Sequence, residues 1–146
     1  YGPYGRPDMS ILRFIHWIQT GEKLILYGDG SQRRSFTYID DIVKGLMLLI
    51  EYEGSGTFNF GSNETWSLNE IIEIIEKNTG KIADISFEDR AYKDVDIVLP
   101  NLNKSNNILN WKPTTNIKDG IMNTVNWYLA NQEKLNDIKF KYDYEK

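Results

Sequence analysis

Residues 24–42 read LILYGDGSQRRSFTYIDDI, and they hold strand, turn and helix signals in immediate succession. Leu24 to Tyr27 predicts a short strand, which the Gly28-Asp29-Gly30-Ser31 turn ends. Phe36 to Ile39 predicts a second strand, and the acidic pair at 40–41 then begins a helix, with both acids near its positive end. This succession is typical of a mixed α/β domain with short strands.

The same alternation continues on both sides of that stretch. Asp8 is expected to cap a first helix that ends before Gly21, and Ser67-Leu68-Asn69-Glu70 is a capping box for a later one. Apolar residues at helical spacing and short β-prone runs predict the remaining elements. The expected helices are 8–20, 40–50, 67–80, 104–110 and 117–129, and the further expected strands are Thr57 to Phe60, Ile82 to Phe87 and Ile97 to Leu99.

The composition bounds the class of protein. The chain has 146 residues, of which 40% are hydrophobic and 26% charged, and that length fits one domain with a single core. It has no Cys and one His, which argues against a disulfide framework, a cysteine nucleophile and a metal site. A net charge of −4 argues against binding nucleic acid by bulk electrostatics, and no apolar run is long enough to span a membrane. We therefore expect a cytoplasmic globular domain without nucleic-acid or membrane partners.

The two ends of the chain differ from its middle. Tyr1-Gly2-Pro3-Tyr4-Gly5-Arg6-Pro7 has turn chemistry, with no initiator Met and no signal-peptide pattern, so we expect the C-terminal part of a longer protein. Residues 1–132 are expected to form the compact domain. Residues 133–146 are expected to form a polar tail that is partly disordered.

The turn after the first strand raises two questions of function. Gly28-Asp29-Gly30 begins like a dinucleotide-binding loop, but Arg33 stands where the third Gly would be required. Arg33 and Arg34 follow directly. They are either a solvated pair on a hairpin, as most exposed arginine pairs are, or a fork that grips a diphosphate through bidentate N–H donors.

Two other features are interpreted as structural or accidental. His16 lies between apolar neighbours in the first expected helix, which favours a structural histidine over a catalyst. Tyr142 and Lys146 have the Tyr-x-x-x-Lys spacing of a general acid–base pair, but they lie in the polar tail, and we interpret the spacing as a coincidence.

Three segments carry a resemblance to a known family. They are Tyr1 to Met9, Leu26 to Ile42, and Leu109-Asn110-Trp111-Lys112-Pro113 with the shorter Asp94-Val95 and Asn103-Lys104 before it. Together they resemble the C-terminal, substrate-binding part of NAD-dependent nucleotide-sugar epimerases and dehydratases, the extended short-chain dehydrogenase/reductase family. Gly5-Arg6-Pro7-Asp8-Met9 is most similar to UDP-glucuronate 4-epimerases. The resemblance implies a small mixed α/β substrate-binding domain, with the Rossmann half of the family absent from this chain.

The resemblance also implies roles for five residues. Arg34 matches the arginine that binds the nucleotide diphosphate, and Arg90 a second arginine that reaches the diphosphate or ribose. Tyr27 and Leu26 match the strand end that packs on the nucleotide base. Arg6 matches an arginine near the sugar, where it would meet the carboxylate of a hexuronate.

The resemblance bears on the activity of the whole protein as well. In such enzymes the glycine-rich NAD loop and the catalytic Tyr-x-x-x-Lys pair precede the point where this chain starts, so no catalytic or cofactor-binding residue is expected in it. The parent would be an NAD-dependent epimerase or dehydratase that acts on a UDP-hexose or UDP-hexuronate through a keto intermediate. The parent could be a homodimer, and this chain alone would be inactive.

The sequence departs from the family pattern at three positions. Ser35, Asn101 and Asn110 stand where the family usually has Asp, Asp and Gly. Two alternatives stay open: a stand-alone nucleotide-binding module, and a degenerate relic that no longer binds nucleotide.

Overall fold

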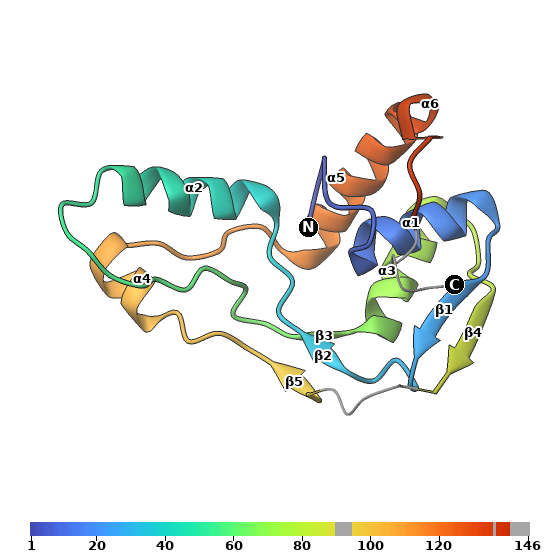
Figure 1. Ribbon diagram of the computed structural model, residues 1–146, viewed down its shortest axis with the longest axis horizontal. Helices are drawn as coiled ribbons and strands as arrows, with labels where there is room; N and C mark the ends of the chain where they lie inside the picture. Colours follow the sequence, from blue (N-terminus) through green and yellow to red (C-terminus); the bar gives the residue numbers. More distant parts are fainter. Residues whose placement is uncertain (90–94, 136, 141–146) are drawn as a thin grey trace.

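The computed structural model describes residues 1–89, 95–135 and 137–140 (Figure 1). Short strands alternate with helices along the chain, which confirms the expected mixed α/β class. The helices are α1 (Ser10–Thr20), α2 (Ile39–Ile50), α3 (Leu68–Thr79), α4 (Asn103–Leu109), α5 (Ile117–Ala130) and α6 (Gln132–Leu135). The strands are β1 (Leu24–Tyr27), β2 (Arg33–Arg34), β3 (Trp66–Ser67), β4 (Ile85–Glu88) and β5 (Ile97–Val98).

The described strands form two small sheets. In the first, β1 pairs in parallel with β4, and Tyr27 lies opposite Glu88 at its carboxyl end. In the second, β2 is the middle strand, antiparallel to β3 and parallel to β5. Figure 1 shows that the 28–32 turn connects the two sheets along one edge of the molecule. The β4–β5 connection follows Glu88, the register partner of Tyr27.

The hydrophobic core lies where α1, α3 and α5 pack together against β1. Its fully buried members are aliphatic or aromatic side chains from each of these elements, among them Phe14, Ile15, Leu24, Ile71, Ile75 and Ile121. The α3 helix starts at the expected capping box, because Ser67 Oγ accepts from the Glu70 amide and Glu70 accepts from the Ser67 amide. Both α1 and α3 end at a glycine with a positive φ angle, Gly21 and Gly80.

The α2 and α4 helices form an arm that extends away from this core (Figure 1). The buried Asp41 side chain fixes the base of the arm, because it accepts hydrogen bonds from the Thr114 and Thr115 amides at 3.1 and 2.8 Å. The indole of Trp111 donates to the Asp41 carbonyl at 2.8 Å. The acid predicted only as a helix-start residue therefore also joins α2 to a segment about 70 residues later.

Three expected elements differ from those observed. The first helix starts at Ser10 with Met9 at the N-cap, because the Asp8 carboxylate pairs with Arg6 instead of capping. Strand pairing occurs at Arg33–Arg34 and not at Phe36 to Ile39, and α2 starts at Ile39. Thr57 to Phe60 is not a strand, because no described segment pairs with it.

Two apolar residues of the expected tail lie in the hydrophobic core. Leu135 ends α6, and it is buried together with Phe140. The division into a domain over residues 1–132 and a polar tail over residues 133–146 stays a prediction. Residues 136 and 141–146, with the Tyr142 and Lys146 pair, lie outside the described residues.

Candidate functional site

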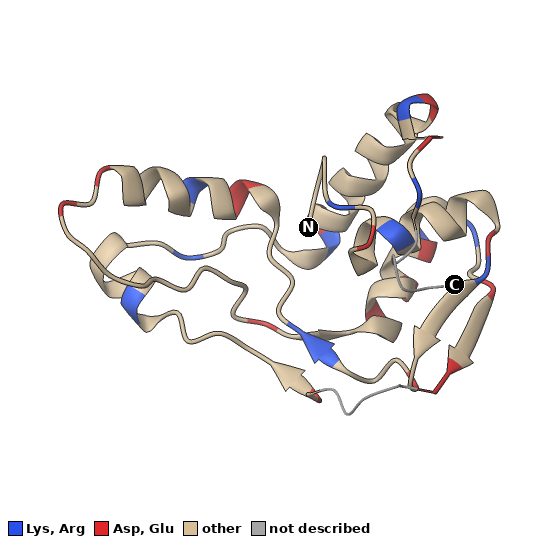
Figure 2. Ribbon diagram, in the orientation of Figure 1, with Lys and Arg blue, Asp and Glu red and all other residues tan. Residues whose placement is uncertain are grey.

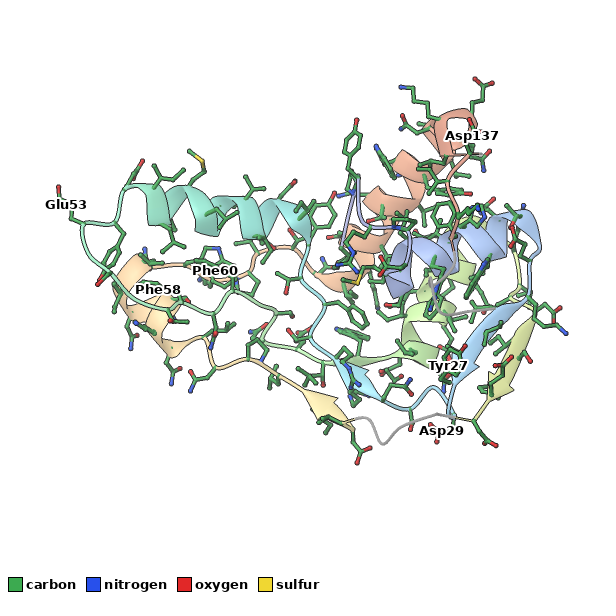
Figure 3. The ribbon with its side chains drawn as sticks, in the orientation of Figure 1. Tyr27, Asp29, Glu53, Phe58, Phe60 and Asp137 are labelled. Atoms are coloured by element: carbon green, nitrogen blue, oxygen red, sulfur yellow. The ribbon has the colours of Figure 1, made fainter. Side chains whose placement is uncertain are left out.

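The carboxyl end of the β1–β4 pair positions the first predicted binding residue. Ligands of open α/β sheets bind outside the carboxyl ends of parallel strands, and Tyr27 is the last residue of β1. Its carbonyl accepts a 3.3 Å hydrogen bond from the buried amide side chain of Gln32, and the next amide, Gly28, donates to the Glu88 carbonyl at 2.8 Å. These contacts hold the backbone of Tyr27 in place. Figure 3 shows Tyr27 and Asp29 on the same edge of the molecule.

The turn after Tyr27 is held by its own side chains and by α3. Asp29 Oδ1 accepts from the Ser31 amide at 3.0 Å and from the Ser31 hydroxyl at 2.6 Å. The Asn69 side chain donates a hydrogen bond from Nδ2 to the Asp29 carbonyl, and the backbone N–H of Asn69 donates to the Gly30 carbonyl. Gly30 has a φ of +76°, and a Cβ there would stand 2.1 Å from the Asn69 amide oxygen. The turn is therefore fixed before any ligand arrives, and only glycine fits at position 30.

The structure gives the two arginines after the turn different environments. Arg33 is held by the first turn of α3 and the loop before it: its guanidinium donates to Thr65 through Nε at 3.2 Å and Nη2 at 2.6 Å, and Nη1 pairs with Glu70 at 2.9 Å. Arg34 Nη1 donates to the carbonyls of Arg33 and Asp96, at 2.8 and 3.4 Å. The pair is therefore not simply solvated. Arg33 joins β2 to α3, whereas the Arg34 guanidinium reaches from β2 to Asp96, the residue before β5.

Ser35 follows Arg34 in the position where the resembling family usually has Asp. Its hydroxyl donates to the Ser62 carbonyl and accepts from the Ser62 amide, both at 2.9 Å. The smaller side chain is therefore fully hydrogen-bonded, and the backbone next to Arg34 is fixed by it.

The remaining predicted residues lie in three different places. Arg6 is exposed and donates to Asp8 through Nε at 3.0 Å and Nη2 at 2.5 Å, which raises the pKa of Arg6 and lowers that of Asp8. The Leu26 side chain is 1% exposed and belongs to the core, so only its backbone is left to contact a nucleotide base. Arg90 lies outside the described residues, two positions after Glu88, the β4 residue opposite Tyr27.

Arg6 belongs to a loop that is tied to the segment after Arg34. The backbone of Tyr1 donates to the Thr37 carbonyl at 2.7 Å and accepts from the Ile39 amide at 2.8 Å. Gly5 and Pro7, on either side of Arg6, line a hollow whose far wall includes Trp127 and Phe140. The structure thus brings Tyr27 and Arg34 to the two sides of one turn, and it connects the Arg6 loop to them through the 37–39 segment.

His16 has a structural environment, as the sequence predicts. Its Nδ1 lies 2.8 Å from the Tyr128 hydroxyl, its Nε2 lies 3.2 Å from Glu22, and its ring stacks on Phe140 with centroids 3.8 Å apart. Burial lowers the pKa of His16, although the Glu22 carboxylate acts in the opposite direction. The neutral imidazole therefore joins α1, α5 and the C-terminal segment.

The sequence analysis missed the residues that hold the candidate site in place. Gln32, Thr65 and Asn69 fix the Tyr27 carbonyl, the Arg33 guanidinium and the turn, respectively. Two of these contacts join positions 32 and 40 residues apart, and no local pattern indicates them. Within the described ranges, no group of three or more His, Asp or Glu side chains could hold a metal ion. No helix in those ranges is long and apolar enough to cross a membrane.

Comparison with known protein families shows which family the chain belongs to. Residues 1–124 match the GDP-mannose 4,6 dehydratase family. The chain belongs to this family. Its relatives include proteins named UDP-glucuronate 4-epimerase from Thermodesulfobacterium geofontis, 41% identical over 140 residues, and UDP-glucuronate 4-epimerase 1 from Arabidopsis thaliana, 33% identical over 149 residues. These alignments cover 95% and 89% of this chain but 43% and 34% of the relatives.

Solved structures show the same fold. MoeE5 in complex with UDP-glucose and NAD superposes with a TM-score of 0.85 at 30% identity, over 90% of this chain and 45% of the other. UDP-glucuronic acid 4-epimerase from Bacillus cereus, in complex with UDP-glucuronic acid and NAD, superposes with a TM-score of 0.83 at 31% identity, over 89% of this chain and 42% of the other. The chain therefore spans less than half the length of the relatives and solved structures that it matches, and the expected small mixed α/β fold of the C-terminal part of such epimerases and dehydratases is confirmed.

Proposed function

We propose that this chain is the nucleotide-sugar-binding part of an NAD-dependent enzyme that acts on a UDP-hexuronate or UDP-hexose, with 4-epimerisation of UDP-glucuronate as the favoured reaction. The observation that carries the proposal is the pre-formed edge made by Tyr27, the fixed turn and Arg34. Family members of known structure with TM-scores of 0.83 to 0.85 were solved with UDP-sugars and NAD, which supports this choice of ligand.

Each proposed contact follows from the chemistry of its side chain. The Tyr27 ring offers an apolar face for a planar base at the end of β1. A guanidinium offers paired N–H donors that match phosphate oxygens, so Arg34 would hold the diphosphate, with Arg90 as a second cation. The Arg6 guanidinium would bind the sugar carboxylate and thereby favour a hexuronate over a hexose.

The chain would contribute orientation rather than chemistry. NAD, when bound to the complete enzyme, would accept and return a hydride at the sugar carbon, and the sugar would pass through a keto form. We propose no residue of this chain as a ligand of NAD or as the acid–base catalyst. By clamping base, diphosphate and sugar along one edge, the chain would hold the reacting carbon in place, and such positioning accelerates reactions strongly.

The test uses a chimera of the Thermodesulfobacterium geofontis relative in which this chain replaces the part that it matches. We expect NAD-dependent conversion of UDP-glucuronate by the chimera and none by this chain alone. Arg34→Ala should raise KM for UDP-glucuronate about tenfold to a hundredfold, because a charged hydrogen bond contributes roughly 1.5–3 kcal/mol. Lys118→Ala, which removes an exposed cation on α5, is the matched control and should leave KM unchanged.

Other outcomes would redirect the proposal. A chimera that binds UDP-glucuronate without converting it would favour the nucleotide-binding module without catalysis. A folded chimera whose binding is insensitive to Arg34→Ala would remove the diphosphate role of that residue. Turnover by this chain alone would contradict the assignment of the chemistry to another part of the enzyme.

A further inference from the structure

The two arginines of β2 use their guanidinium groups differently. β2 consists of Arg33 and Arg34 and is drawn blue in Figure 2. Each guanidinium nitrogen of Arg33 has a partner, because Nε and Nη2 donate to Thr65 and Nη1 pairs with Glu70 at 2.9 Å. Successive side chains of a strand point to opposite faces, so we expect Arg34 on the other face of β2. Arg33 is therefore engaged within the chain, and Arg34 is the arginine proposed for the diphosphate.

The backbone of Arg33 supports the guanidinium of Arg34. Arg34 Nη1 donates to the Arg33 carbonyl at 2.8 Å and to the Asp96 carbonyl at 3.4 Å. The shorter of these two contacts depends on how the carbonyl of Arg33 is oriented. Because β2 is only two residues long, few ladder hydrogen bonds hold it. The side-chain contacts of Arg33 therefore help to fix the carbonyl on which the Arg34 guanidinium rests.

Glu70 holds Arg33 from the first turn of α3. One carboxylate oxygen of Glu70, Oε2, accepts from the Ser67 amide at 2.7 Å and pairs with Arg33 Nη1 at 2.9 Å. The backbone hydrogen bond from Ser67 is the main cause that lowers the pKa of Glu70, and Arg33 adds to it. A functional side chain is held precisely only when the residues behind it are themselves fixed. The capped start of α3 supplies such a fixed carboxylate.

We propose that Glu70 is a positioning residue for Arg34: by holding the Arg33 guanidinium, it fixes the carbonyl against which the Arg34 guanidinium rests. The inference rests on the proposed function, in which Arg34 binds the diphosphate of the substrate. Glu70 itself does not touch the substrate. A carboxylate near a diphosphate repels it, so the charge of Glu70 by itself opposes binding. Its effect through position and its effect through charge therefore have opposite signs.

KM and kcat for UDP-glucuronate, measured in the chimera with the Thermodesulfobacterium geofontis relative, test this inference. Glu70→Gln keeps an acceptor for the Ser67 amide, because Gln also completes a capping box, but it removes the charge that holds Arg33. We expect KM to rise about threefold to tenfold with kcat unchanged, since a charged hydrogen bond that supports the ligand-binding group is lost. A loss of folded protein would instead lower kcat and leave KM unchanged. If Glu70 acted only through its charge, the same substitution would lower KM.

The matched control is Glu73→Gln, which removes the same charge from an exposed position of the same helix and should leave KM unchanged. In the Arg34→Ala background, Glu70→Gln should raise KM no further, because residues that act through one contact give non-additive effects.

Two kinds of failure are distinguishable. A lower or unchanged KM in Glu70→Gln, or effects of Glu70→Gln and Arg34→Ala that simply add, would overturn the positioning role and leave the diphosphate role of Arg34 intact. An unchanged KM in Arg34→Ala would contradict the proposed function itself, and the positioning role with it.

Discussion

Single residues in this structure do more than their local patterns indicate, and Asp41 is the clearest case. The acidic pair at 40–41 predicts a helix start, and Asp41 does lie in the first turn of α2. Its carboxylate, however, also accepts from the Thr114 hydroxyl at 2.8 Å and from Lys44 at 3.2 Å, in addition to two backbone amides. One side chain thus sets both a helix end and the attachment of the arm.

Asp41 makes stability depend on pH. Burial would raise its pKa, but hydrogen bonds from Thr115, Thr114 and Lys44 outweigh burial and lower the pKa to about 2, from an ordinary 3.8. Because the folded pKa lies below the unfolded one, this stabilisation is present above about pH 4 and is lost as pH falls toward 2, by roughly 2 kcal/mol. Urea unfolding between pH 2 and 7 should show a steeper acid loss for the natural chain than for Asp41→Asn. Parallel curves would contradict the assignment.

Asn110 makes a conformational prediction at the same scale. It ends α4 with a φ of +50°, where the resembling family usually has Gly. Asn tolerates the left-handed conformation, whereas a β-branched side chain there is strained by roughly 1–2 kcal/mol. We expect Asn110→Gly to leave the free energy of unfolding nearly unchanged and Asn110→Val to lower it by that amount. Equal losses in both variants would show that the Asn side chain itself, and not the backbone, is needed.

At the scale of elements, local signals predict the helices better than the strands. The α3 capping box is correct to the residue, because its hydrogen bonds join positions three apart and need no partner elsewhere. Strands need a partner: pairing falls at Arg33–Arg34 because β3 and β5 lie beside those residues, whereas no strand of the described chain pairs with Phe36 to Ile39 or with Thr57 to Phe60. A strand-like sequence is therefore not sufficient for a ladder.

The capping box of α3 allows a test of how two elements support each other. Glu70 completes the box and also pairs with Arg33, so α3 and β2 share one carboxylate. Ser67→Ala should cost about 1 kcal/mol of stability through the lost cap. Glu70→Ala should cost more, because it removes a cap contact and releases Arg33 as well. Urea unfolding of both variants decides this, and a smaller loss for Glu70→Ala would show that its pair with Arg33 contributes nothing.

At the scale of the whole molecule, an arm extends from a core, and Asp41 at the start of α2 fixes its base to the 111–115 segment. The core closes on itself through α1, α3, α5 and β1, while the arm leaves apolar surface exposed. His16 belongs to the closure of the core, since it touches Glu22, Tyr128 and Phe140 at once. The protonation state of His16 therefore depends on how α1 packs against α5 and Phe140.

His16 also makes stability depend on pH, but burial lowers its pKa, whereas hydrogen bonds lower the pKa of Asp41. Burial lowers the pKa of His16 below its ordinary 6.5, so folding favours the neutral ring. Stability is then fully present above pH 6.5 and falls as pH drops below it, because the unfolded chain binds the proton more readily. Between pH 7 and pH 5 the natural chain should lose more unfolding free energy than His16→Gln. A gain for the natural chain in that range would show that the Glu22 carboxylate dominates.

Much of the candidate site was predictable, but not what holds it. Tyr27 and Arg34 were predicted from a family resemblance, and the structure places them on the two sides of one turn; their roles stay a prediction. The roles of Arg6 and Arg90 likewise stay predictions. Leu26 was predicted to pack on the nucleotide base, but its side chain lies in the core, because a strand residue shows which face it occupies only once the sheet has neighbours. Thr65 and Asn69 act on residues 32 and 40 positions away, and nothing in their immediate sequence distinguishes them.

The sequence by itself determined the class of fold, the existence of helices α1 to α5, the turn at 28–31 and the family. The first three depend on interactions between residues close in the chain, and the family is recognised from short sequence motifs. Only the tertiary structure decided which strands pair, that Arg33 and Arg34 have different environments, and that Asp41 holds the arm. The physical reason is that burial and backbone pairing are properties of neighbours in space, which a linear pattern does not contain.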